Sequence, residues 1–419
     1  MPKVNYVQPC GASDVTITFP STSGTLALSG AGLTGFIPSQ NTAAPNNTVN
    51  ASRLLVDATS TNADIVLQPK GTGAFLAQLP DSTTTGGNKR GARAVDLQMQ
   101  RGSAGQAALG TNSVITGGAN NIADAQYCYV GGGFNNYSGT NQGTVVVGGT
   151  SNLSYGVASF VGGGASNSVS QNYSNVVGGI SNQVTSPFAS ILGGNSNVLA
   201  CDYGVIAGGQ SNNANSATHS AILCGFSNVV AANYASVING YTNTVYGNYS
   251  TVLNGFNNVA NNDYCVIGGR GSTTRTVYQK SYSSYRRAFN GDTQQATYHL
   301  VALTTNGTPT VMTAGLGAVA STNLINIPAG STLTYKIIIA CRQVGGTNLG
   351  AWEITGVADN TAGTITLYNS TVNLIHRTVG TWTTIAVADS TNQSVNIQVT
   401  GSGTTVLWSA TVNTIIAYA

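Results

Sequence analysis

The sequence predicts an all-β protein in which a long parallel β-solenoid is followed by a C-terminal antiparallel β-sandwich. Two observations lead to this prediction. A glycine and asparagine motif recurs in constant phase through the middle of the chain, and strands of alternating apolar and polar residues fill the C-terminal third. Because 53 of the 419 residues are glycine and only 6% are charged, disorder is the first alternative to exclude.

The repeat is anchored on a glycine that recurs every 15 or 16 residues, with a final step of 14, and in the first ten units an asparagine follows three residues later. A random asparagine-rich tract would not hold this phase, so the repeat excludes disorder. The anchor glycines are Gly118, Gly133, Gly149, Gly164, Gly179, Gly194, Gly209, Gly225, Gly240, Gly255 and Gly269. The asparagines are Asn121, Asn136, Asn152, Asn167, Asn182, Asn197, Asn212, Asn228, Asn243 and Asn258.

Each unit is too short for a helical hairpin and centres on a β-branched pair such as Val176 and Val177, which predicts one coil of a β-solenoid. Glycine supplies the positive φ of the corner, and the asparagine caps the turn. Stacked asparagines are expected to form an amide ladder. About eleven coils at ~4.8 Å spacing predict a rod of roughly 50 Å.

Adjacent residues of a strand point to opposite faces, so Val176 and Val177 cannot share one core. Val176, with a small residue two positions earlier, suits the narrow interior of the coil. The opposite face carries Val177, Leu192, Leu223, Ile238 and Leu253, and beside them Tyr173, Phe188, Tyr203, His219, Tyr234 and Tyr249. An apolar face this long is not tolerated on a monomer. We therefore expect it to pack against other copies, around a threefold axis, in a homotrimer.

The aromatic row has two interpretations. Its rings could stack against sugars, or they could fill the seams between subunits, and the second interpretation is favoured. His219 occupies an aromatic position of the row, so a structural role is expected for it over that of a general base.

The VVGGxSNxV units resemble the left-handed parallel β-roll repeats of YadA-type trimeric adhesin heads, which also occur in phage tail fibres. The phrases DIVLQPKGTG and GGNKRGARAVDLQ before the rod resemble tail-fibre segments, and so do RRAFNGDTQQATYHLVALTTNGTPTVMT and IPAGSTLTYKIII after it. The resemblance implies a homotrimeric phage tail fibre, assembled in the host cytoplasm and located in the virion. Its N-terminal end would contact a baseplate or tail protein, and its C-terminal end a host surface polysaccharide or protein.

The predicted organisation has five parts: a virion-attachment segment (1–52), an intertwined β segment (53–102), the solenoid (103–272), a neck (273–296) and a receptor-binding β-sandwich, jelly-roll-like in its strand pattern (297–419). In the sandwich, strand phase places Trp352 and Trp408 in the core. It places Tyr368 and Trp382 on the outside as candidate glycan contacts. His376 and Arg377, whose strand phase is ambiguous, are expected to assist them by hydrogen bonding. The alternative is that these aromatic residues cover a subunit seam.

Two basic clusters lie outside the repeat. Lys89, Arg90 and Arg93 could contact an acidic partner, although a solvated turn is the simpler expectation. The second cluster mixes cations with tyrosines, which is a pattern that can bind RNA; a trimer neck with charged outer positions is favoured because the segment is short. It comprises Arg270, Arg275, Lys280, Arg286, Arg287, Tyr278, Tyr282 and Tyr285.

Several functional classes are disfavoured. The net charge of +3 is too dilute for a nucleic-acid footprint, and the six cysteines show no CxxC pairing, so we expect no nucleic acid, metal or cofactor. The chain starts without a signal-peptide pattern and has no run of 18 apolar residues, so we expect cytoplasmic synthesis and no membrane insertion. For the same reason, and because heptads are missing, a bacterial trimeric surface adhesin fits poorly.

The remaining alternatives are a binding fibre without enzymatic activity and a polysaccharide depolymerase tailspike. Glycosidic cleavage needs two carboxylates a few ångströms apart. The C-terminal module offers only Glu353, Asp359 and Asp389, without local pairing, although carboxylates of different subunits could still meet. We therefore expect a protein that is not an enzyme.

Overall fold

The computed structural model describes residues 66–285 and 290–418, together with the backbone of four short strands further upstream. These strands form two antiparallel pairs, β1 (Thr16–Thr18) with β2 (Ala27–Ser29) and β3 (Phe36–Gln40) with β4 (Asn50–Leu54). The rest of the predicted attachment segment (1–52) lies outside the described residues. Residues 1–71 and 72–419 form separate units, and the second contains both the rod and the C-terminal module.

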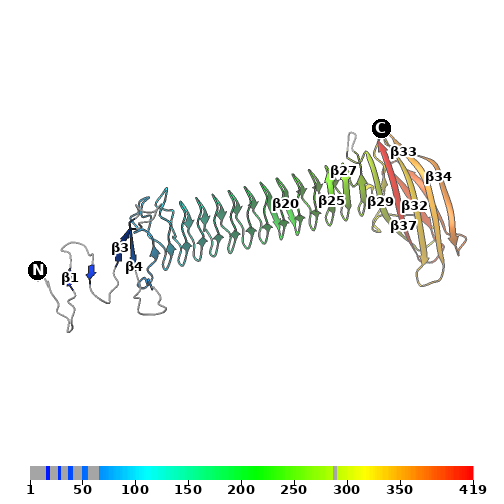
Figure 1. The fold of residues 1–419 in the computed structure, drawn as a ribbon. Coiled ribbons are helices and arrows are strands. Elements are labelled where there is room, and N and C mark those ends of the chain that lie inside the picture. Colours follow the sequence, from blue (N-terminus) through cyan, green and yellow to red (C-terminus); the bar gives the residue numbers. More distant parts are fainter. Residues whose placement is uncertain are drawn as a thin grey trace. The chain divides into compact units, whose positions relative to one another are not determined.

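The rod is a parallel β-solenoid whose coils contribute short strands to two sheets (Figure 1). The first sheet runs in the order β5 (Phe75–Leu76), β6 (Val95–Asp96), β7 (Val114–Ile115), β9 (Tyr129–Val130), β11 (Val145–Val146), β13 (Phe160–Val161), β15 (Asn175–Val176), β17 (Ser190–Ile191), β19 (Val205–Ile206), β21 (Ala221–Ile222), β23 (Ser236–Val237), β25 (Thr251–Phe256), β27 (Val266–Arg270) and β28 (Lys280–Ser283). The second sheet contains β8 (Ile122–Ala123), β10 (Tyr137–Ser138), β12 (Leu153–Ser154), β14 (Ser168–Val169), β16 (Gln183–Val184), β18 (Val198–Asp202), β20 (Asn213–Thr218), β22 (Val229–Val230), β24 (Thr244–Val245) and β26 (Val259–Ala260).

The solenoid has about 13 turns, so the predicted number of eleven is too small. The additional parallel pairings lie at the two ends. Phe75 pairs with Val95 and Val95 with Val114, across steps longer than the repeat and without its glycine and asparagine signature. At the other end, β28 pairs in parallel with β27 inside the stretch expected to be a neck.

Strand alternation sorts the side chains of each coil as expected. Val176 and Ile191 are fully buried in the interior, as are the small residues Ser174 and Ala189 beside them. The anchor glycines have positive φ, for example +97° at Gly194, where a Cβ atom would overlap the backbone of the next coil. Only glycine fits this corner.

The ten repeat asparagines form the predicted amide ladder and are 0% or 1% exposed. The Oδ1 atom of Asn182 accepts hydrogen bonds from the backbone N–H of Asn197 (3.1 Å) and from its Nδ2 group (3.1 Å). The Nδ2 group of Asn182 donates to Gly178 O (3.0 Å) and Gly194 O (3.0 Å). Each buried amide therefore satisfies its own polar atoms and those of two neighbouring corners.

The C-terminal module contains two antiparallel sheets. The first follows the order β29 (Thr293–Thr304), β37 (Val406–Tyr418), β32 (Ser331–Gln343), β33 (Leu349–Thr361) and β34 (Thr364–Arg377). The second contains β30 (Thr310–Val311), β36 (Ser394–Thr400) and β31 (Ile325–Asn326), with β35 (Thr383–Asp389) also paired to β36 and the 3-10 helix η1 (Ser321–Asn323) nearby. Since β28 pairs with β29, the rod and the first sheet share one ladder of hydrogen bonds.

Both sheets bury their inner faces in one core, as the predicted sandwich requires. Trp352 is 2% exposed and Trp408 is fully buried, which confirms their expected places. Their rings lie 5.5 Å apart, and Trp408 Nε1 donates to Thr304 Oγ1 at 2.9 Å.

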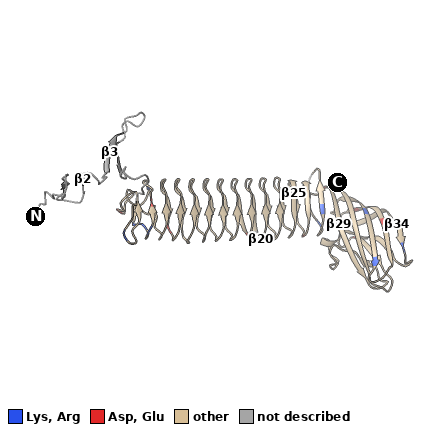
Figure 2. Ribbon diagram, turned by 60° about the horizontal axis from the view of Figure 1, so that its bottom comes forward, with Lys and Arg blue, Asp and Glu red and all other residues tan. Residues whose placement is uncertain are grey.

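Charge is nearly absent from the rod, which has no Lys or Arg between Ser103 and Gly269. Figure 2 shows this as a tan rod, with charged residues gathered near its ends and in the C-terminal module. Among the described residues, no helix is long and apolar enough to cross a membrane.

Candidate functional site

The four residues predicted to contact a receptor do not form one cluster. Tyr368 is 52% exposed on β34, with Thr364 and Thr366 on the same face, so its predicted phase is confirmed. His376 is also exposed on β34, eight residues further, which corresponds to about 25 Å along a strand. Arg377 is half-buried and donates from Nη1 to Trp382 O at 2.8 Å. The structure therefore brings together only this last pair.

The predicted exposure of Trp382 is wrong, because this residue is fully buried. Its ring lies 6.0 Å from that of Trp408, and its Nε1 donates to Ser402 Oγ at 2.9 Å. The phase of β35 is inverted with it: Thr384 is 7% exposed, whereas Ile385 is 53% exposed. A shift of one residue moves every side chain of a strand to the other face. Burial of the large Trp382 indole directly before β35 explains why Thr384 faces inward and Ile385 outward.

The rod presents continuous rows of exposed apolar side chains. The row of Val177, Leu192, Leu223, Ile238 and Leu253 is between 38% and 51% exposed in the single chain. A second row is an aromatic stack with ring centroids 4.8 to 5.3 Å apart and nearly parallel planes. It contains Tyr173, Phe188, Tyr203, His219, Tyr234, Tyr249, Tyr264 and Tyr278. Because the rings cover each other's faces, sugars would meet only their edges, and this geometry favours the seam interpretation over the sugar platform.

His219 lies inside this stack, between Tyr203 at 4.9 Å and Tyr234 at 4.8 Å. Its imidazole takes the place of an aromatic ring and lies nearly parallel to both neighbours, at 11° to Tyr203 and 10° to Tyr234. This position agrees with a structural role.

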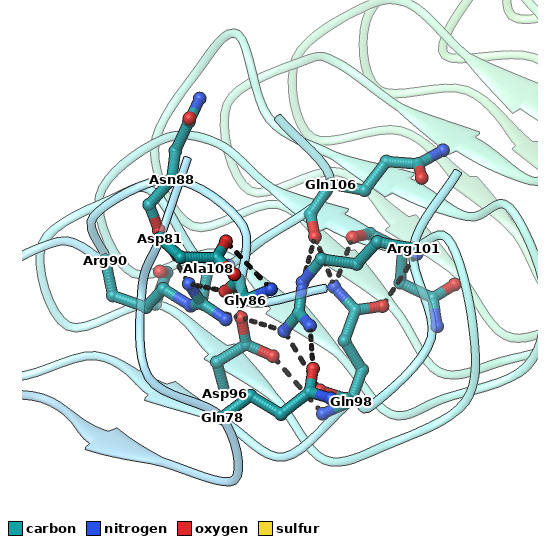
Figure 3. Close-up of polar contacts among 12 residues, drawn as sticks. Gln78, Asp81, Gly86, Asn88, Arg90, Asp96, Gln98, Arg101, Gln106 and Ala108 are labelled. Atoms are coloured by element: carbon teal, nitrogen blue, oxygen red, sulfur yellow. Dashed lines mark hydrogen bonds and ion pairs between the residues drawn. The ribbon is translucent and has the colours of Figure 1, made fainter. Parts of the chain in front are cut away.

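The first basic cluster is partly internal, which corrects the expectation that Arg90 contacts a partner or solvent. Arg90 Nε and Arg101 Nη2 both donate to the buried carboxylate of Asp96, at 2.6 and 3.1 Å (Figure 3). The same group includes Gln98, which accepts from Asn121 N at 2.9 Å and so begins the amide ladder. Sequence reasoning missed Asp96 and Gln98, although both stand in the phrase AVDLQ directly after the basic cluster.

The second basic cluster does not form one cationic strip. Arg270 lies over the Phe256 ring at 5.7 Å, whereas Arg275 is turned toward Gly291 O at 3.3 Å. Burial lowers the pKa of Arg275. Lys280 is exposed on the outer face of β28, and Arg286 and Arg287 lie outside the described residues.

The carboxylates of the C-terminal module are all held by local partners. Glu353 pairs with Lys336 at 2.9 Å, and Asp359 lies six residues along the same strand, about 20 Å away. Hydrogen bonds from Thr361 and Thr332 lower the pKa of Asp359. Burial opposes a similar shift at Asp389, but hydrogen bonds from Asn392 and Asn396 prevail and lower its pKa. A glycosidase pair needs less than 10 Å between its carboxyl groups, so Glu353 and Asp359, about 20 Å apart along one strand, do not form such a pair within one chain.

The described cysteines do not pair. Cys128, Cys201, Cys265 and Cys341 are buried thiols, and Cys224 is exposed at a coil corner; Cys10 lies outside the described residues. Within the described parts of the chain, no three His, Cys, Asp or Glu residues gather in a metal-binding arrangement.

No family model and no curated protein matches the chain. Among solved structures, the chain is weakly similar to tailspike gp49 of Acinetobacter baumannii bacteriophage Fri1, a capsular polysaccharide depolymerase, with 8% identity, coverage of 82% of this chain and 72% of that one, and a TM-score of 0.21. For the tailspike of Acinetobacter phage vB_ApiP_P1 the values are 7%, 83%, 81% and 0.18. For the tailspike of A. baumannii phage AM24 they are 7%, 80%, 68% and 0.20. This weak similarity assigns no activity to the chain.

Proposed function

We propose that this chain is the structural and receptor-binding fibre of a phage tail, in which three copies lie side by side along the rod. One observation carries the proposal: a solenoid with very few charged residues exposes an apolar row, Val177 to Leu253, along successive coils. Exposed apolar surface of this extent marks an interaction site. Identical rows on three copies would cover one another around a threefold axis.

In this assembly the N-terminal segment attaches to a baseplate or tail protein, and the C-terminal module binds a polysaccharide or protein of the host surface. The resemblance of the repeats and flanking phrases to phage tail fibres supports this polarity. The hydrogen-bonded continuity from β27 through β28 to β29 supports a module that is rigidly presented at the end of the rod.

The proposed activity is binding without cleavage. Glu353, Asp359 and Asp389 are separated or engaged in local hydrogen bonds, as described above. Binding by such a surface needs shape, hydrogen bonds and stacking, and no reactive carboxyl.

Assembly is tested on the intact chain by sedimentation, which should show a species of three chains. Cys224 offers an independent test because it is exposed directly beside Leu223 of the apolar row. If the rows meet, mild oxidation should crosslink chains in pairs, and Cys224→Ser should abolish the crosslink. A well-folded single-chain species, without crosslinks, contradicts the proposed assembly.

Binding is tested with labelled intact protein on a panel of bacterial strains and their purified surface polysaccharides. Retention on at least one strain, with no shortening of its polysaccharide, is the expected result. Shortened chains would replace the proposal with the depolymerase alternative, and retention on no strain would remove the receptor-binding part.

A further inference from the structure

A hollow of about 450 Å³ lies where the rod passes into the C-terminal module. Its walls come from β25, β27, β28 and β29, and its lining includes Leu253, Asn254, Lys280, Tyr282, Gln295 and Thr297. Leu253 is also the last residue of the apolar row proposed to meet other copies, so the hollow begins where that row ends. Pockets of roughly 300 to 1,000 Å³ are the size that binds small organic ligands. None of the receptor contacts predicted from the sequence lies in this hollow.

Strand register places its polar groups on one surface. Lys280 pairs with Thr297 and Tyr282 with Gln295 across the antiparallel β28 and β29. Lys280 and Tyr282 are two residues apart, so they point to the same face about 7 Å from each other. The Tyr282 side chain is 57% exposed and lies beside Gly268, which has no side chain to crowd the ring. A flat aromatic ring therefore stands next to a cation.

The charge of Lys280 is not neutralised within the described part of the chain, where it takes part in no ion pair. Lys336 provides the contrast, because it stands on the same face and is paired with Glu353 at 2.9 Å. The rod beside the hollow is almost free of acids. The hollow therefore offers one uncompensated positive charge to a ligand.

A second hollow of about 280 Å³ adjoins the first and shares Gln295 with it. Its lining includes Thr334, Lys336, Asn413 and Ile415, on the outer face of the same sheet. The two hollows together follow the sheet from β28 to β32. A chain-like ligand of several rings fits this path better than a compact one.

We propose that the two hollows form a binding groove for an acidic saccharide. One sugar ring lies on Tyr282, its carboxylate or phosphate group contacts Lys280, and the amide of Gln295 bonds hydroxyl groups between the two hollows. Aromatic rings and nearby amides suit the apolar faces and hydroxyl edges of sugars, and the free ammonium group selects the charged member of a pair. This inference rests on the proposed receptor-binding function, for which it names a ligand class and a place.

The test measures binding of the intact chain to three tetrasaccharides: tetragalacturonate, its neutral methyl ester and a phosphate-bearing maltotetraose. We expect at least one acidic probe to bind about tenfold or more tightly than the neutral ester, and the two acidic arms distinguish carboxylate from phosphate. Lys280→Ala and Tyr282→Ala should each weaken that binding about tenfold or more, whereas Tyr282→Phe should retain it. The matched control is Arg342→Ala, which removes an exposed cation from the same sheet face outside both hollows and should have no effect.

The proposal is overturned if neither acidic probe binds, or if Lys280→Ala binds like the unchanged protein. It is also overturned if the Lys280 and Tyr282 variants, shown to be folded by circular dichroism, lose chain association, since a second copy would then fill the groove. Retention on bacterial strains is measured in parallel. If both variants are still retained on the strains, the groove is refuted and the proposed function stands. If the intact chain is retained on no strain, the proposed receptor-binding function is refuted, whatever the saccharide probes show.

Discussion

The amide ladder gives the most direct test of how the rod is held together, through the substitution Asn182→Ala. In the folded chain the side chain of Asn182 is fully buried and accepts from the N–H of Asn197 at 3.1 Å. It also donates to the carbonyl of Gly178 at 3.0 Å. Alanine removes both interactions and supplies no substitute.

The expected loss of stability follows from the hydrogen bonds that each partner of Asn182 retains after the substitution. The buried N–H of Asn197 loses its acceptor, and an unsatisfied buried group costs about 1–3 kcal/mol. The carbonyl of Gly178 loses a hydrogen bond with a net value of about 1 kcal/mol. By contrast, Gly194 O keeps the backbone N–H of Ile180, and Asn167 Oδ1 keeps that of Asn182. The expected loss is therefore about 2–4 kcal/mol per chain.

Because each coil contacts only its neighbours, the loss should appear as local opening. Hydrogen exchange followed by mass spectrometry is the suitable assay, and amides of the two adjoining coils should exchange about 30- to 700-fold faster. The matched control is Asn195→Ala, whose exposed side chain accepts a hydrogen bond from Ser196 Oγ of the neighbouring residue; this substitution should leave exchange unchanged. Equal exchange in the two variants would refute the assignment of the ladder as a structural element.

Three further outcomes are expected. Gly194→Ala should cost at least about 2 kcal/mol in the same exchange assay, because its φ is positive and a Cβ meets the backbone of the next coil, whereas Gly193→Ala has open space and should be neutral. Asp96→Asn should destabilise the first coils by about 3–5 kcal/mol, since two buried arginines lose their counter-charge; exchange should stay normal in the exposed control Asp124→Asn. The lowered pKa of Asp389 means that its stabilisation is complete above the ordinary value of 3.8 and is lost as pH falls through the folded-state pKa. Asp389→Asn should therefore weaken the acid dependence of thermal unfolding of the module, and an unchanged acid limb would contradict this reasoning.

Sequence reasoning succeeded where the structure is periodic. The spacing of glycine and asparagine fixes the length of a coil, and alternation then separates Val176 from Val177 without further information. The same argument placed Trp352 and Trp408 correctly, because long strands with a clear alternation leave one choice of face. These successes depend on many repeated, mutually consistent local signals.

It failed where one local feature overrides the pattern. Trp382 precedes β35, and burial of its large indole reverses the strand phase that the neighbouring threonine and isoleucine suggested. The sequence did not predict the first coils, because their strands are separated by more residues than one repeat and lack the glycine and asparagine motif. The groove at Lys280 and Tyr282 combines β28 with three other strands, and only the fold brings these together.

The two ends of the solenoid explain why lateral association is the expected mode of assembly. Towards the N-terminal end, buried Gln98 takes the place of a ladder asparagine, and Asp96 holds two arginines over the coil interior. At the other end, Asn258 Oδ1 accepts from Ser272 N at 2.8 Å, while Gln294 of the C-terminal module accepts from Thr273 N at 2.7 Å. Both ends of the asparagine ladder are thus capped by polar groups of the same chain, so no ladder amide among the described residues is left to pair with another chain end to end. The apolar rows along the side remain, and only neighbours lying alongside the rod can cover them.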